Sequence, residues 1–218
     1  MKFYVVIPAR YDSTRFPGKV LANINNITML ERVFNNAKES SATEVFIATD
    51  SDKVFKSAKK YTRNVFMTSN ENVNGTERVA ELANILKWKA DTLVINLQAD
   101  MPELQHDNIN LLAEKSINND GLSTLYYDLE NPKLKMSKNT VKICINEENI
   151  NFCRTVEDNI SDKIYKHIGI YGYYVKDLIG YKLLPRSENE KDLSLEQFRF
   201  VDNGYNISAY YAVSDPGI

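Results

Sequence analysis

The 218-residue sequence has few cysteines and no excess of charge of either sign. Cys144 and Cys153 are its only cysteines, and without a second cluster they disfavour a zinc site or a disulfide framework, so we expect reduced thiols in a cytoplasmic protein. The 27 Lys and Arg residues nearly balance the 29 Asp and Glu residues, so no global basic field favours nucleic acid. No apolar run approaches the roughly 20 residues that cross a bilayer, so we expect no membrane insertion.

What the chain does have is the composition of a globular protein, with 43% apolar and 26% charged residues. Its length suits one domain over residues 1–218. The first two-thirds alternates strand and helix patterns. The predicted strands are 2–8, 44–49, 64–68 and 92–97, and the predicted helices are 27–39, 51–61 and 74–88. This alternation predicts a three-layer α/β fold with a mostly parallel, Rossmann-like central sheet.

The remainder of the chain is more mixed and predicts a smaller region attached to that sheet. The predicted strands are 122–129, 141–145, 167–174 and 207–213, the predicted helices are 175–184 and 193–202, and the predicted exposed loops are 157–163 and 186–192. We therefore expect residues 1–120 to form mainly a nucleotide-binding half and residues 121–218 mainly an acceptor-binding half.

The loop after the first predicted strand carries three cations. Arg10, Arg15 and Lys19 follow the apolar run 3–7, and the loop is punctuated by proline and by Gly18. In an open α/β sheet, this loop lies at the crevice where ligands bind. Cations and backbone N–H groups gathered there suit a polyphosphate, although charge alone favours a solvated basic loop. The spacing is not that of a Walker A loop.

Asp100 stands just past the buried strand 92–97, at its carboxyl end. A carboxylate in that place suits Mg²⁺ facing a triphosphate. A turn-forming aspartate before Pro102 is an equally good interpretation of the residues alone.

Residues 74–78 form a second candidate turn, Asn-Gly-Thr-Glu-Arg. Gly75 lets the backbone approach a ligand closely, and the N-terminus of the following helix favours an anion or a polar ring. Asn74 with Glu77 three residues later also resembles an ordinary capping box, with Arg78 at the surface, and the residues alone favour this second interpretation.

The order of residues in these segments resembles the sugar-acid cytidylyltransferases, most closely the branch that activates 3-deoxy-manno-octulosonate (Kdo). Residues 8–21 fit the signature P-A-R-Y-x-S-T-R-x-P-G-K-x-L at every specified position. Residues 74–78 fit S-G-T-E-R except at Asn74, and residues 98–102 fit Q-G-D-E-P except at Ala99 and Met101. Met101 removes a carboxylate beside the expected metal site.

The resemblance implies roles for individual residues of the first half. Arg10, Lys19 and Asp100 would be catalytic, and Asp100 would also hold the cofactor, Mg²⁺. The residues implied in nucleotide binding are Pro8, Ala9, Arg10, Ser13, Arg15, Lys19, Asn74, Gly75, Thr76, Arg78 and Gln98.

Segments of the second half resemble the family's acceptor site. They are residues 166–173 (R/K-H-x-G-I-Y-G-Y), residues 195–199 (L-E-Q-L-R), residues 139–142 (N-x-V-K) and residues 152–154 (F-S-R). The implied substrate-binding residues are Gln98, Lys142, Arg154, His167, Tyr171, Gly172, Glu196 and Gln197. From the residues alone, a satisfied core histidine and an exposed helix face would explain His167, Glu196 and Gln197.

The implied reaction joins CTP and Kdo to give CMP-Kdo and pyrophosphate. The resemblance also implies a cytoplasmic homodimer that serves lipopolysaccharide biosynthesis. Two alternatives stay open: a cytidylyltransferase for a related acid, such as 8-amino-Kdo or a nonulosonate, and a nucleotide-binding protein without efficient turnover. The family's second metal ligand, in a V-D-T segment, would follow Ile218, so we expect these 218 residues to need high Mg²⁺.

Overall fold

One mixed sheet forms the centre of this computed structural model, which describes residues 2–12, 16–117, 119–146, 150–156 and 163–217. Seven of its strands follow the order β11-β7-β10-β6-β1-β4-β5. Their bounds are β1 (Phe3–Ala9), β4 (Glu44–Thr49), β5 (Val65–Met67), β6 (Leu93–Leu97), β7 (Leu122–Tyr127), β10 (Lys163–Tyr174) and β11 (Ile207–Tyr211). Strand β10 runs antiparallel to its neighbours β6 and β7, while every other pair along this path is parallel. The predicted mostly parallel α/β sheet is therefore confirmed.

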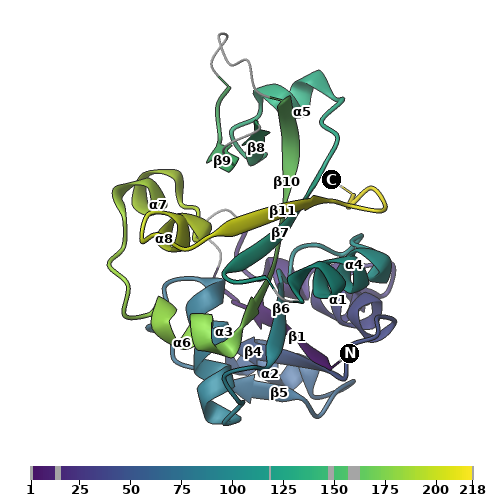
Figure 1. Cartoon of the computed structure of the whole chain (residues 1–218). Coiled ribbons are helices and arrows are strands. Elements are labelled where there is room, and N and C mark those ends of the chain that lie inside the picture. The colour runs from purple at the N-terminus through teal and green to yellow at the C-terminus, as the bar shows by residue number, and fades with distance from the viewer. Residues whose placement is uncertain (1, 13–15, 118, 147–149, 157–162, 218) are drawn as a thin grey trace.

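Helices cover both faces of the sheet and make the predicted three layers (Figure 1). The helices are α1 (Met29–Lys38), α2 (Asp52–Ala58), α3 (Gly75–Ile85), α4 (His106–Ser116) and α6 (Val175–Tyr181). The core cluster on one face joins β1 to α1, α2 and α4, and the cluster on the other face joins β1 to α3 and α6. Alternate residues of β1 serve the two cores, because Val5 and Ile7 belong to the first cluster and Val6 to the second.

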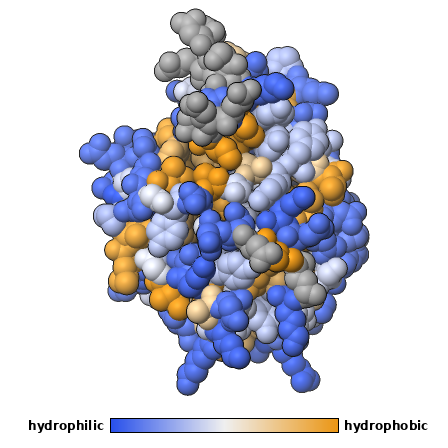
Figure 2. Space-filling model, viewed as in Figure 1, coloured by the Kyte–Doolittle hydropathy of each residue, from blue (hydrophilic) through white to orange (hydrophobic). Residues whose placement is uncertain are grey.

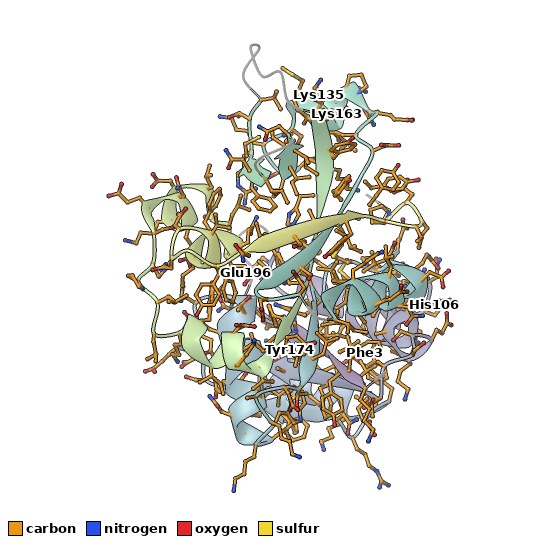
Figure 3. The ribbon with its side chains drawn as sticks, in the orientation of Figure 1. Phe3, His106, Lys135, Lys163, Tyr174 and Glu196 are labelled. Atoms are coloured by element: carbon orange, nitrogen blue, oxygen red, sulfur yellow. The ribbon has the colours of Figure 1, made fainter. Side chains whose placement is uncertain are left out.

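A small lobe projects from the end of β10 (Figure 1). It contains β8 (Lys142–Ile145), β9 (Ile150–Cys153) and α5 (Pro132–Met136), and Lys135 and Lys163 lie at its far end (Figure 3). β10 is long enough to pair with the central sheet through one part and with β8 through the other, and its register shifts between Ile168 and Tyr171. The lobe has its own core cluster, shared with α8 (Gln197–Val201).

The chain from Tyr181 onward departs from the prediction. Residues 186–192 were expected to be an exposed loop, but α7 (Glu188–Leu193) occupies most of them. Ser187 caps this helix by accepting the backbone N–H of Glu190, at 3.1 Å. The helix predicted over 193–202 is shorter, because Ser194 adopts a left-handed conformation (φ 52°) that ends α7 before α8 begins.

Other differences are smaller. Helix α4, the hairpin of β2 (Asn23–Ile24) and β3 (Ile27–Thr28), and the turn η1 (Lys19–Leu21) were not foreseen. Of the predicted loop 157–163, residues 157–162 lie outside the described residues and Lys163 already belongs to β10. Within the described ranges, no helix has the length and apolar character to cross a membrane. Hydrophilic residues cover most of the face shown in Figure 2, with apolar patches among them.

Candidate active site

A cleft of about 210 Å³ opens at the carboxyl ends of β1 and β6, where a ligand is expected in an open α/β sheet. Its lining comes from the loop after β1, the start of α3 and the segment after β6. The lining residues are Pro8, Arg10, Asp12, Lys19, Val20, Gly75, Arg78, Gln98, Ala99 and Asp100. The three segments singled out in the sequence for a nucleotide thus meet at one place.

Cations and carboxylates line this first pocket together, and Lys19 pairs with Asp100. The Nζ of Lys19 lies 3.0 Å from Oδ2 of Asp100, and both side chains are substantially exposed. Arg10 is half-buried and donates from Nη2 to the carbonyl of Asn72. The pocket therefore offers positive charge beside a carboxylate, a combination that suits the phosphates of a nucleotide with a divalent cation.

A second pocket of about 380 Å³ adjoins the first, because Gly75 and Gln98 line both. The remaining lining comes mainly from β10, from α7 and from the turn before α8. The lining residues are Val73, Asn74, Gly75, Gln98, Gly169, Tyr171, Arg186, Glu190, Ser194, Leu195, Glu196 and Gln197. A Cβ at Gly75 would come within 3.1 Å of Pro8 Cγ and 3.3 Å of Gln98 Nε2, so glycine keeps the junction of the two pockets open.

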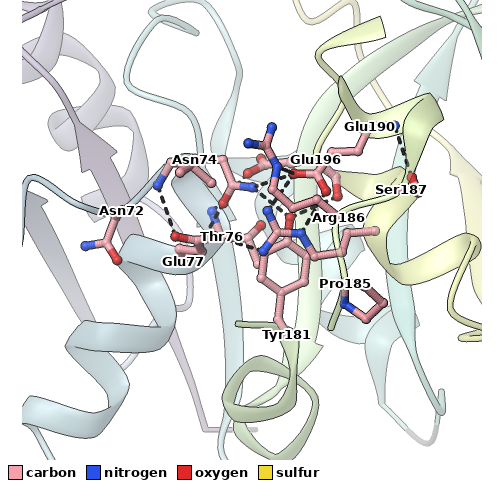
Figure 4. Close-up of polar contacts among 12 residues, drawn as sticks. Asn72, Asn74, Thr76, Glu77, Tyr181, Pro185, Arg186, Ser187, Glu190 and Glu196 are labelled. Atoms are coloured by element: carbon pink, nitrogen blue, oxygen red, sulfur yellow. Dashed lines mark hydrogen bonds and ion pairs between the residues drawn. The ribbon is translucent and has the colours of Figure 1, made fainter. Parts of the chain in front are cut away.

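Glu196 connects the N-terminus of α3 to the second pocket (Figures 3 and 4). Its Oε2 accepts the backbone N–H of Thr76 at 2.9 Å, and its Oε1 accepts Nε2 of Gln98 at 3.1 Å. Burial raises the pKa of this carboxyl group, and the bond from Thr76 opposes that shift. The alternative of an exposed helix face is thus wrong for Glu196, which lines the pocket.

Tyr171, Gln197 and Asn74 also line the second pocket. The hydroxyl of Tyr171 donates to Oε1 of Gln197 at 2.9 Å, and both side chains are buried. Asn74 caps α3 by accepting the N–H of Glu77 at 2.9 Å, and its Nδ2 donates to the hydroxyl of Tyr181 at 2.7 Å. These side chains give the second pocket a polar lining that is suited to hydroxyl groups.

A buried ionic network fixes the position of α3 relative to α7 and α8. Arg199 is about 1% exposed and donates to Glu190 at 2.6 and 2.8 Å and to Glu77 at 2.8 Å. Burial lowers the pKa of Arg199, but the bonds to the two carboxylates outweigh that effect and raise it. The network holds both sides of the second pocket together, and sequence analysis missed it.

Arg78 is fully buried, contrary to the surface position that a simple cap would give it. Its Nη2 lies 2.6 Å from Oδ2 of Asp50, and its Nη1 donates to Thr68 at 2.5 Å. Arg78 still lines the first pocket, whereas Asn74, on the same turn, lines the second pocket and Thr76 lines neither. Asp50 does not cap α2, because Ser51 accepts the N–H of Val54 there.

Lys142 and Arg154 do not line either of the two pockets within the described residues. Lys142 is buried, and its Nζ donates to the carbonyls of Ser137 (2.5 Å) and Arg154 (2.7 Å). Arg154 donates to the carbonyls of Leu193, Ser194 and Lys138. Arg154 therefore connects the small lobe to the turn between α7 and α8, while Lys142 bonds within the lobe.

His167, Gly172 and Ala9 also lie away from the two pockets. The Nε2 of His167 is 3.0 Å from Oγ1 of Thr124, and burial lowers the pKa of this histidine to about 3. A Cβ at Gly172 would collide with Oγ of Ser116, so this position faces α4 rather than a pocket. Ala9 is buried in the core, whereas Ser13 and Arg15 lie outside the described residues.

Three charged lining residues were not singled out in the sequence. Asp12 occupies the unspecified position of the first signature and adds a second carboxylate to the first pocket. Arg186 and Glu190 belong to the segment expected to be a loop, where only the spacing Ser187-x-x-Glu190 signals a helix start.

The chain belongs to the cytidylyltransferase family, whose sequence model matches residues 4–207. It is 37% identical to the 3-deoxy-manno-octulosonate cytidylyltransferase of Fusobacterium nucleatum, over 95% of this chain and 87% of the relative. It is 36% identical to the enzyme of the same name from Pseudoalteromonas translucida, over 99% of this chain and 91% of the relative.

A solved structure supports the same classification. The structure of CMP:2-keto-3-deoxy-manno-octonic acid synthetase complexed with CTP superimposes with a TM-score of 0.85 and 32% identity, over 97% of this chain and 90% of that one. A cytidylyltransferase from Leptospira borgpetersenii shares the fold alone, with a TM-score of 0.63 at 17% identity.

Proposed function

We propose that this protein transfers CMP from CTP to the anomeric hydroxyl of Kdo, giving CMP-Kdo and pyrophosphate. The observation that carries the proposal is the pair of adjoining pockets, which share Gly75 and Gln98. The first contains cations suited to phosphates, and the second contains amides, a tyrosine hydroxyl and carboxylates suited to a polyhydroxylated sugar acid. The names of the relatives, a 3-deoxy-manno-octulosonate cytidylyltransferase and a CMP:2-keto-3-deoxy-manno-octonic acid synthetase complexed with CTP, support the proposal.

The reaction requires positioning and charge neutralisation rather than a covalent intermediate. The anomeric oxygen attacks the α-phosphorus in line as the bond to the β-phosphate oxygen breaks. Pyrophosphate leaves with that electron pair, and the hydroxyl proton passes to solvent. Arg10 and Lys19 would neutralise the phosphate oxygens from the first pocket. Gln98, at the boundary of the two pockets, is placed to contact both reactants.

We also propose Mg²⁺ as the cofactor, held by Asp100. Among the described residues no group of three or more histidine, cysteine or acidic side chains could form a metal cage. Mg²⁺ usually takes only one or two carboxylates together with substrate phosphates, and the exposed Asp100 beside Lys19 fits that requirement. When bound, Mg²⁺ would polarise the phosphate groups, while Lys19 and Arg10 orient them.

The turn 74–78 is proposed to contact the cytidine. Gly75 presents bare backbone between Pro8 and Gln98, and a small polar site of this kind favours cytosine over a purine. Arg78 would act here through its contact with Asp50 and Thr68, which fixes the turn from behind.

A homodimer, a cytoplasmic location and a role in lipopolysaccharide biosynthesis complete the proposal. They rest on the resemblance to the family. Light scattering coupled to size exclusion would measure the mass in solution, for which a homodimer of the 25.0 kDa chain predicts twice that value.

The experiment that tests the proposed function measures pyrophosphate release with CTP, Mg²⁺ and a panel of sugar acids, beside calorimetry with CTP alone. Release with Kdo, and none with ATP or GTP in place of CTP, supports the proposal. Faster release with 8-amino-Kdo or a nonulosonate would reassign the acceptor. CTP binding without release for any acid would indicate a nucleotide-binding protein instead.

A further inference from the structure

Arg186 is the only cation among the described residues that line the second pocket. The pocket also holds Glu190 and Glu196, while its other lining residues are uncharged. An acidic sugar that enters this pocket must therefore place its carboxylate next to Arg186. In any other place, the carboxylate would have no cationic partner among these lining residues. Buried or half-buried charges are rarely left unpaired, because the loss of hydration is costly.

The other cations expected to bind the acceptor are already committed elsewhere. The Nε, Nη1 and Nη2 atoms of Arg154 each donate to a main-chain carbonyl. Lys142 donates to two more carbonyls and has 0% exposure. The depressed pKa of His167 keeps it neutral near pH 7, and its Nε2 is bonded to Thr124.

Arg186 lines the pocket and is held there by Glu190. Its Nε lies 3.2 Å from Oε1 of Glu190, and its side chain remains 45% exposed. In the described part of the chain, Nη1 and Nη2 have no hydrogen-bond partner. Figure 4 shows Arg186 together with Asn74, Glu190 and Glu196.

Glu190 is itself fixed, because Arg199 binds both of its carboxylate oxygens from the core side. A buried arginine therefore orients a buried carboxylate, which in turn orients Arg186 at the pocket. A pre-oriented guanidinium loses less freedom when it forms a two-pronged bond to a carboxylate.

We propose that the Nη1 and Nη2 atoms of Arg186 bind the carboxylate of the acceptor and make Arg186 a specificity-determining residue for sugar acids. The inference rests on the proposed function, in which the second pocket receives the acceptor. Glu196, whose oxygens already accept bonds from Thr76 and Gln98, is left to accept hydroxyl groups of the sugar. Arg186 is therefore the group that distinguishes an acid from a neutral sugar of the same shape.

Steady-state kinetics of Arg186→Ala, with the acceptor and CTP varied separately, tests this assignment. Loss of a charge-assisted, two-pronged contact should raise the KM for the acceptor by about 10- to 100-fold and leave the KM for CTP unchanged. Arg186→Lys keeps the charge without the planar guanidinium, so its KM for the acceptor should lie between those of the wild type and Arg186→Ala. Lys182→Ala removes an exposed cation four residues earlier that does not line the pocket, and it should match the wild type.

An acceptor whose carboxylate is replaced by a carboxamide separates recognition from a change in shape. The wild type should bind this analogue poorly, and Arg186→Ala should lose little further affinity for it. If Arg186→Ala loses as much affinity for the carboxamide as for the acid, Arg186 only supports the fold of the pocket. A melting temperature lowered enough to explain the loss of activity would show the same. An unchanged acceptor KM overturns the inference while the proposed function stands. No pyrophosphate release by the wild type with any acid would overturn both.

Discussion

The ammonium group of Lys19 lies 3.0 Å from a carboxylate oxygen of Asp100, although 81 residues separate them in the chain. The pair joins the loop after β1 to the segment after β6, and both residues line the first pocket. Since both side chains are substantially exposed, the pair adds little to folding stability. When a nucleotide and a divalent cation bind, we expect the pair to separate, with Lys19 contacting a phosphate and Asp100 contacting the cation.

The first prediction concerns this pair. Lys19→Ala should raise the KM for CTP or lower turnover by about 10-fold or more, because a phosphate contact to a charged group is lost. The melting temperature should change little. Steady-state kinetics and a circular-dichroism melt measure the two effects.

Lys56→Ala is the matched control, because Lys56 is exposed on α2 and does not line the first pocket. Equal CTP kinetics in Lys19→Ala and Lys56→Ala would contradict the assignment of Lys19 to the phosphates.

The second prediction concerns the buried network of Arg199. Arg199→Met should destabilise the protein by about 3–5 kcal/mol, because buried Glu77 would lose this cation and buried Glu190 would keep only the half-exposed Arg186. Urea denaturation measures the change. Arg199→Lys should recover part of the stability, and a Met variant as stable as the wild type would show that the carboxylates find other partners.

Much of the first half could be predicted because its signals are local. The run 93–97 is apolar except for Asn96 and becomes the central strand β6, and Ser51 and Asn74 cap helices where the sequence places them. Local signals of this kind depend only on neighbouring residues, so no knowledge of the tertiary structure is needed.

The second half was harder to predict, because its polar residues are buried by partners far away in the sequence. Glu190 looks like part of a charged loop, yet Arg199 and the helix cap bury it. In the sequence, Lys142 resembles a cation that binds the substrate, yet its Nζ donates to the carbonyls of Ser137 and Arg154. A sequence shows the type of charge, but only the fold shows whether its donors are still available to a ligand.

The third prediction concerns Cys153, whose Sγ lies 3.8 Å from that of Cys144 across β8 and β9. The bond from Cys144 lowers the pKa of Cys153 to about 7, burial opposes the shift, and the charge of Lys142 adds to it. The rate of alkylation by iodoacetamide should therefore rise with pH and reach half its maximum near pH 7, since the thiolate is the reactive form.

Cys144→Val removes the donor and should move this midpoint toward the ordinary value of about 8.5. Mass spectrometry of the labelled peptide measures the rate, and Cys153→Ser identifies any labelling elsewhere. The same midpoint in wild type and Cys144→Val would rule out the contribution of Cys144.

The last prediction concerns stability at low pH. His167 is about 7% exposed, and burial lowers its pKa to about 3, whereas an unfolded histidine titrates near 6.5. Between these values the unfolded state binds a proton that the folded state does not, so stability falls as the pH falls below about 6.5. The loss from this residue should reach about 1.4 kcal/mol one unit below the unfolded pKa. His167→Gln keeps a polar side chain near Thr124 but cannot titrate, so its free energy of unfolding should depend less on pH between 6.5 and 4.5. Urea denaturation of both proteins across that range measures the difference, and parallel pH profiles would refute the assignment.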